Sequence, residues 1–117
     1  MSDSPVAGFL RVRAGVRELA LPAAIVQEVA ELGSVTPLPG VHGAVLGVTN
    51  LRGVLVTIVG LEALMTGGAA TVTDTVVIVV EDGRRVGLAV DEVLAFGAVE
   101  SATVLEPGGL LAPIFDG

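Results

Sequence analysis

Short runs of β-branched and aliphatic residues, broken by glycine, dominate the chain. Residues 9–14 largely alternate apolar and polar side chains, and Gly15 then permits a turn into a second segment at 17–21. This arrangement predicts a β-hairpin. Valine, isoleucine and leucine at this density favour pleated, half-buried surfaces over helices, so we expect a mainly β protein.

A second hairpin is predicted in the later half of the chain. Residues 75–80 form a continuous apolar run, Glu81-Asp82-Gly83 supplies a turn, and residues 85–90 return with period-two alternation. The Asp-Gly pair is a typical signal for a tight hairpin turn. Further strands are expected at 34–38, 45–49, 54–59, 93–99 and 110–115.

Two short segments carry apolar residues at helical spacing. Proline suits a first helical position, so Pro22 together with Ile25, Val26 and Val29 predicts a helix over 22–32 that ends near Gly33. The second segment is a single turn, and residues 67–70 beyond it look like a linker or a crossover. Its apolar edge consists of Leu61, Leu64 and Met65, and Gly67-Gly68 ends it.

Length and composition predict one compact intracellular domain. The chain has 117 residues, and 52% of them are hydrophobic, which is enough to build a core. The absence of cysteine excludes disulfides and thiolate chemistry and fits the cytoplasm. Residues 1–5 do not resemble a secretory signal, and the longest uncharged run, 32–51, contains two prolines and several polar residues, so we expect no membrane insertion.

The charge balance points away from nucleic acid and lipid surfaces. Six arginines and no lysines face 13 acidic residues, and the formal net charge of -7 would repel phosphate groups. Three phenylalanines, with no tryptophan or tyrosine, offer few stacking platforms for single-stranded nucleic acid. A protein partner is therefore the more plausible class.

The residues that usually carry catalysis are scarce. The single histidine, His42, lies among glycines and prolines and is best interpreted as a solvated turn residue without a metal partner. Glycines in the segment 40–47 have no lysine to complete a phosphate-binding loop. Three carboxylate pairs are interpreted as solvated surface: Glu81 with Asp82, Asp91 with Glu92, and Glu28 with Glu31 on the predicted first helix. We predict no catalytic, cofactor-binding or metal-binding residues.

The most specific stretch is 47–59, which reads GVTNLRGVLVTIV. An apolar strand reaches Asn50, turns through Leu51-Arg52-Gly53 and enters another apolar strand. Arg52 would then lie on a sharp turn, where its guanidinium group could bind a carboxylate or carbonyl of a partner. The alternative is an arginine that ties the turn to Asp or Glu of its own chain, and spacing alone favours neither.

Two internal similarities indicate a repeated structural unit. Residues 15–17 resemble 83–85, since each is a glycine turn followed by arginine and a strand. Residues 53–60 resemble 109–116 in the same way. Two small, similar β-barrels in one chain are the natural interpretation.

The stretch at 47–54 resembles the signature of the CheW-like domain family. Similarity extends upstream to 25–29 and 36–39, and downstream to 75–80 and 85–93, so that it covers residues 9–116. The resemblance implies two small SH3-like β-barrel subdomains packed together, with one or two short helices, in a single domain over 1–117. This agrees with the internal similarities.

The resemblance also implies a non-enzymatic adaptor role in bacterial chemosensory arrays. Members of the family bind the regulatory domain of a CheA-type histidine kinase and the cytoplasmic tip of a methyl-accepting chemoreceptor. By residue match, seven positions are candidates for the receptor-facing groove or its support, and the aliphatic ones among them can equally be core residues. These are Val26, Gln27, Glu28, Val48, Asn50, Leu51 and Arg52.

The chain departs from the family pattern in three places. Thr57 and Gly60 stand where the family typically has proline and aspartate. The connection between the last two predicted strands, 100–108, is shorter than in the family. The chain also stops at Gly117. We therefore expect a shortened second subdomain, receptor binding that survives better than kinase binding, and an open sheet edge that could drive self-association. Two alternatives are a small-molecule-binding or enzymatic β-barrel outside chemotaxis, and a module detached from a larger regulator.

Overall fold

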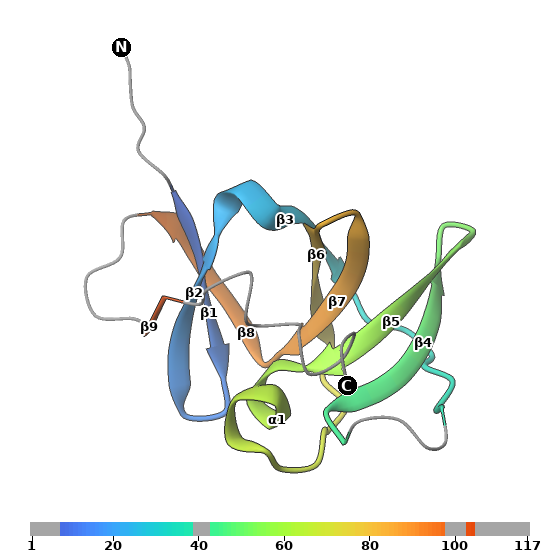
Figure 1. The fold of residues 1–117 in the computed structure, drawn as a ribbon. Helices are drawn as coiled ribbons and strands as arrows, with labels where there is room; N and C mark the ends of the chain where they lie inside the picture. The colour runs from blue at the N-terminus through green and yellow to red at the C-terminus, as the bar shows by residue number, and fades with distance from the viewer. Residues whose placement is uncertain (1–7, 39–42, 98–102, 105–117) are drawn as a thin grey trace.

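Two β-sheets make up the computed structural model, which describes residues 8–38, 43–97 and 103–104 (Figure 1). A four-stranded sheet has the order β8-β1-β2-β9, and a five-stranded sheet has the order β3-β6-β7-β5-β4. The predicted fold class, mainly β with two small SH3-like barrel subdomains, is confirmed. The strands are β1 Phe9–Ala14, β2 Arg17–Pro22, β3 Val26–Glu31, β4 Val45–Leu51, β5 Val54–Gly60, β6 Thr75–Glu81, β7 Arg84–Val90, β8 Glu92–Gly97 and β9 Thr103–Val104.

Three hairpins turn through two-residue loops, and each loop uses backbone with positive φ. Gly15 has φ of 66° between β1 and β2. Arg52 and Gly53 have φ of 51° and 85° between β4 and β5, and Asp82 and Gly83 have φ of 52° and 77° between β6 and β7. Two successive positive φ values are characteristic of the type I′ turn, whose twist matches that of the flanking strands. Both hairpins predicted from glycine turns are confirmed.

The five-stranded sheet curls so that its two edge strands approach each other. Its central pair, β5 and β7, runs parallel, and β6 then connects them to β3. The segment after β3 crosses to the other edge, where Thr36 and Val48 exchange backbone hydrogen bonds of 2.8 and 2.9 Å. Thr49 Oγ1 also donates to the Ser34 carbonyl at 2.7 Å. These contacts close the sheet toward a barrel.

Two cores bury opposite faces of this curled sheet. Because side chains alternate between faces along a strand, β6 and β7 must be apolar at consecutive positions to be buried on both. Val76 to Val79 are all nearly inaccessible, which explains the continuous apolar run. The core between the two sheets includes Leu10, Val12, Leu19, Leu21, Val59, Leu61, Val77, Val79, Val86, Leu88 and Val90. The core inside the curled sheet consists of Val56, Ile58, Val76, Ile78 and Ala89, with Ala30, Leu32, Val35, Leu46 and Leu51 packed against it.

The predicted helical turn after β5 is confirmed as α1, Leu61–Thr66. It buries Leu61 and Ala63 and ends at Gly67, whose φ of 79° lets its backbone N–H donate to the Ala63 carbonyl at 2.8 Å. No helix in the described ranges is long and apolar enough to cross a bilayer.

The helix predicted over 22–32 is wrong. A single 3₁₀ turn, η1 Ala23–Ile25, follows Pro22, and β3 begins at Val26. The register with β6 shifts between Val26 and Glu28, which is a β-bulge at Gln27. Pairing with β6 satisfies the backbone of this segment, and that tertiary contact outweighs the helical spacing of its apolar residues.

Other predicted strands need smaller corrections. Only Thr36 of the strand expected at 34–38 is paired, through the isolated bridge to Val48. The strand expected at 93–99 begins one residue earlier, as β8 Glu92–Gly97, and its last two predicted positions lie outside the described residues. The strand at 110–115 and the similarity of 109–116 to 53–60 also lie outside them.

Candidate functional site

An open groove lies at one mouth of the curled sheet. Its volume is about 260 Å³. Three of its lining residues each lie two positions before a residue that belongs to or packs against the core inside the curled sheet: Glu28 before Ala30, Val56 before Ile58, and Arg85 before Gly87. Because side chains alternate between faces along a strand, these three lie on the same inner face of the sheet, nearer the beginning of their strands. The groove is thus the outward continuation of the barrel interior. Its lining comes from β3, β4, β5, β7 and the β4–β5 turn: Gln27, Glu28, Leu51, Arg52, Val54, Val56 and Arg85.

Arg52 sits on the β4–β5 turn and reaches across the groove to β3. Its Nη2 donates to Glu28 Oε1 in an ion pair whose side chains are 67% and 30% exposed, respectively. The turn itself is fixed by Asn50, whose Oδ1 accepts a 2.8 Å hydrogen bond from the Gly53 N–H. The interpretation of Arg52 as a tie within its own chain is therefore confirmed. A guanidinium group has five N–H donors, so this pair leaves donors for a partner as well.

Four of the seven predicted interaction residues line the groove. They are Gln27, Glu28, Leu51 and Arg52. The other three lie elsewhere: Val26 packs against the core between the sheets, Val48 carries the bridge to Thr36, and Asn50 holds the turn. The family signature therefore located one wall of the groove and its supports.

Three groove residues were missed by the sequence analysis: Val54, Val56 and Arg85. Val54 and Val56 belong to the specific stretch 47–59, where their period-two spacing with Ile58 could have placed them on one face. Arg85 comes from β7, which pairs in parallel with β5. A parallel pairing has no local turn that would indicate it in the sequence.

The three carboxylate pairs noted in the sequence have separate structural roles. Glu28 and Glu31 lie on β3 instead of on a helix, and Glu28 holds Arg52. Asp91 Oδ2 accepts a 2.5 Å hydrogen bond from the Gly15 N–H, and Glu92 Oε1 accepts one of 3.4 Å from Arg13 Nε. Both contacts attach the β1–β2 hairpin to the start of β8.

Glu81, at the end of β6, is partly withdrawn from solvent. Its Oε2 is buried without a hydrogen-bond partner in the described part of the chain. Burial raises the pKa of this carboxyl above its ordinary value, the neighbouring Asp82 charge raises it further, and Arg84 opposes them. Asp82 occupies the adjacent turn.

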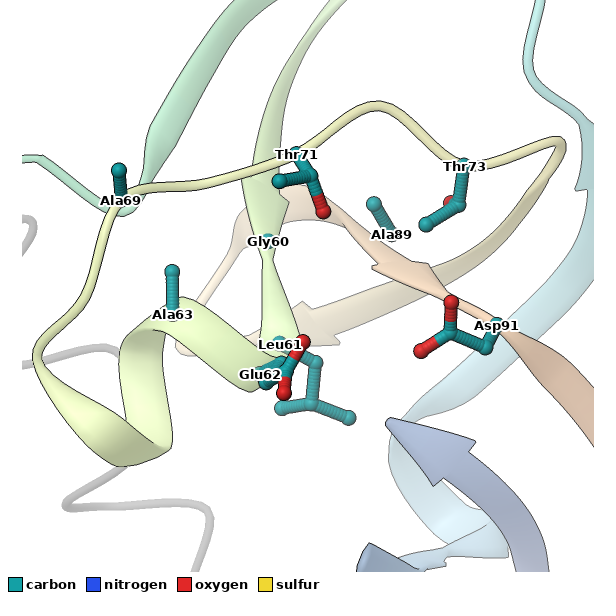
Figure 2. Close-up of a pocket in the computed structure, with 9 residues that line it drawn as sticks. All are labelled: Gly60, Leu61, Glu62, Ala63, Ala69, Thr71, Thr73, Ala89 and Asp91. Atoms are coloured by element: carbon teal, nitrogen blue, oxygen red, sulfur yellow. The ribbon is translucent and has the colours of Figure 1, made fainter. Parts of the chain in front are cut away.

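A second, much smaller hollow lies beside α1 (Figure 2). Its volume is about 10 Å³, roughly the space that one water molecule needs. Glu62 at the start of α1 and Asp91 after β7 contribute carboxylates to it. Across residues 8–38, 43–97 and 103–104, no group of three or more His, Asp or Glu side chains is arranged to hold a metal ion. His42 lies outside those ranges.

Comparison with known proteins agrees with this architecture. The structure is similar to the crystal structure of the scaffolding protein TtCheW from Thermoanaerobacter tengcongensis, with a TM-score of 0.71 and 23% sequence identity. The match covers 81% of this chain and 66% of that one, so the chain spans just under two thirds of its length. The family model of the CheW-like domain matches residues 8–115. The chain therefore belongs to the CheW-like domain family.

Proposed function

We propose that this chain is a non-enzymatic adaptor of a bacterial chemosensory array, acting in the cytoplasm as a single domain over residues 1–117. It would couple the cytoplasmic tip of a chemoreceptor to the regulatory domain of a CheA-type histidine kinase. Membership of the CheW-like family supports the scaffold role. The observation that carries the proposal is the groove around Arg52.

The chemistry of the groove suits a protein segment. Leu51, Val54 and Val56 give it apolar walls, while Arg52, Glu28 and Gln27 give it polar groups. Protein interfaces combine such an apolar patch with a polar rim. An open groove at the mouth of a barrel also offers less enclosure than the pockets that hold small molecules.

The backbone of Arg52 supports a role for its side chain. Its φ of 51° lies in the left-handed region, which asparagine, aspartate and glycine adopt more readily than arginine. Stability alone would therefore favour a different residue at this turn. An arginine held at such a position motivates the hypothesis that its guanidinium group contacts a partner.

The test is calorimetric titration of the chain against two fragments from its own organism, a chemoreceptor signalling tip and a kinase regulatory domain. We expect the chemoreceptor tip to bind more tightly than the kinase domain, and we expect Arg52→Asn, which keeps the turn, to weaken at least one of these interactions by about tenfold. Arg17→Gln is the matched control, because Arg17 is an exposed arginine on β2 of the other sheet. No binding of either fragment would refute the adaptor function, and equal affinities for Arg52→Asn and the wild type would refute the role of Arg52.

A further inference from the structure

Arg85 contributes a second guanidinium group to the groove. It lies on β7 two residues before Gly87, which is buried in the barrel interior against Ile58 and Val76. The same alternation directs the Arg85 side chain to the mouth of that interior, where it lines the groove beside β5. Glu28, on β3, is the one carboxylate among the lining residues.

The two arginines of the groove differ in their electrostatic state. Glu28 already neutralises Arg52 through the ion pair across the groove. The side chain of Arg85 is exposed and makes no hydrogen bond or ion pair with any other residue that the structure describes. An arginine without a countercharge beside apolar walls is an exposed site for an anionic group, although the chain as a whole carries a net charge of -7.

The overall charge selects the kind of anion. A phosphate backbone or an anionic lipid surface presents many negative charges and would be repelled by the surrounding acidic surface. A single carboxylate on a protein segment meets much less repulsion. Such a carboxylate accepts two parallel hydrogen bonds from a guanidinium group, and aliphatic neighbours can pack on Leu51 and Val54.

We propose that Arg85 is the main carboxylate anchor of the groove and that its occupant is a partner-protein segment with an Asp or Glu flanked by Leu, Ile or Val. The proposal rests on the proposed adaptor function, because it names the chemistry of the segment that the adaptor receives. Arg52 has a different part: held by Glu28, it shapes the groove wall and offers its remaining donors to backbone carbonyls of the same segment.

The first experiment selects ligands without assuming any partner. The intact chain, immobilised as wild type, Arg85→Gln, Arg85→Lys or the control Arg17→Gln, is used to select binders from a phage library of random peptides. We expect the wild type and Arg17→Gln to enrich peptides with an acidic residue between aliphatic ones. Enrichment should fall about tenfold or more with Arg85→Gln. Arg85→Lys should retain part of it, because lysine keeps the charge and loses the two-pronged geometry.

Thermal melts of all four proteins accompany the selection, since an exposed side chain should be replaceable without unfolding the sheet. Peptides without the acidic residue, or acidic peptides that Arg85→Gln enriches as well as the wild type does, would overturn the proposal. Failure of the wild type to enrich any peptide would overturn it as well.

The second experiment separates this inference from the proposed function. The selected peptide is titrated in competition with the chemoreceptor tip and the kinase regulatory domain. If neither fragment binds while the peptide binds through Arg85, the adaptor function fails and the anchor stands. If a fragment binds the wild type and Arg85→Gln equally, and the peptide does not compete with it, the adaptor function stands and the anchor fails for that partner.

Discussion

Ile58 fills the space beside Gly87 in the interior of the curled sheet. A Cβ atom placed on Gly87 would lie 2.6 Å from Ile58 Cδ1 and 2.7 Å from Val76 Cγ2. Both distances are shorter than real packing allows, so something in the inner core would have to move. This glycine is required for its lack of a side chain, and its backbone conformation is an ordinary one. The core inside the curled sheet is thus tightly packed around Gly87, on the strand between β6 and β5.

Gly87→Ala should therefore destabilise the protein by about 1 to 3 kcal/mol, the usual cost of overpacking a core. Ile58→Val removes the Cδ1 atom, so the double variant should lose less stability than the sum of the two single changes. Urea unfolding of the four proteins measures this coupling. Strict additivity would mean that the β7 backbone shifts away from Ile58 instead of pressing against it.

Gly53→Ala provides the contrasting case. No atom lies within 4 Å of a Cβ placed on Gly53, but its φ of 85° is unfavourable for any residue with a side chain. We expect a loss of about 1 to 2 kcal/mol in the free energy of unfolding. Combining this change with Ile58→Val should be additive, because the two sites do not touch. Coupling between them in urea unfolding would contradict the backbone explanation.

Replacing Arg52 with asparagine should change the stability of the protein very little, although we expect it to weaken binding. Arg52→Asn gives up an exposed ion pair of less than about 1 kcal/mol, while asparagine adopts positive φ more easily, so the net change in unfolding free energy should stay within about 0.5 kcal/mol. Arg52→Val loses the same pair and adds a β-branched residue in a left-handed conformation, which should cost about 1 kcal/mol more. Thermal melts rank the three proteins. Equal melting temperatures for the two variants would argue against strain at this turn.

The ion pair between Glu28 and Arg52 should contribute little by itself. Both side chains are partly exposed, at 30% and 67%, so solvent screens their attraction. A double-mutant cycle with Glu28→Gln and Arg52→Gln should give a coupling energy below about 1 kcal/mol that shrinks at high salt. A larger, salt-independent coupling would show that the pair helps close the barrel edge.

Glu81 should make stability depend on pH. Burial, reinforced by Asp82, raises the pKa of Glu81 in the folded protein, despite the opposing charge of Arg84. Between the ordinary glutamate pKa and this raised value the folded state binds more protons than the unfolded one, so the contribution of Glu81 falls as pH rises through that window. Glu81→Gln should therefore gain stability relative to the wild type from the acid side of the window to neutral pH. Parallel pH profiles for the two proteins would contradict the raised pKa.

The turn chemistry of this fold could be predicted from the sequence, but the edge strand β3 could not. Asp82-Gly83 and Gly15 specify local backbone conformations, so the hairpins follow from neighbouring residues alone. In β3 the bulge at Gln27 breaks the alternation, and Val29 is 44% exposed although it is apolar. Its apolar positions thus resemble a helix face, and only pairing with the distant β6 decides the conformation.

The residues of the candidate site show the same difference between local and long-range signals. Leu51 and Arg52 of the β4–β5 hairpin, and Gln27 and Glu28 of β3, were candidates by residue match to the family, and of these only the two hairpin residues could also be placed together from local sequence. Arg85 was missed because it reaches the groove through the pairing of Thr57 with Val86, which depends on the crossover formed by α1 and β6. A groove assembled from strands that are distant in sequence cannot be inferred from any one of them.

The strand order also determines when each strand can pair with its neighbour while the chain is being synthesised. The β1–β2 hairpin can form as soon as it leaves the ribosome, yet β1 pairs on its other side with β8, where Phe9 lies opposite Gly97. Until β8 and the second sheet are made, Leu10, Val12, Leu19 and Leu21 have no core to enter. Long-range pairing of this kind slows folding and leaves apolar surface open to aggregation in the meantime. The first hairpin to emerge is consequently among the last to be buried, and a nascent chain paused before β8 would be the species most in need of a chaperone.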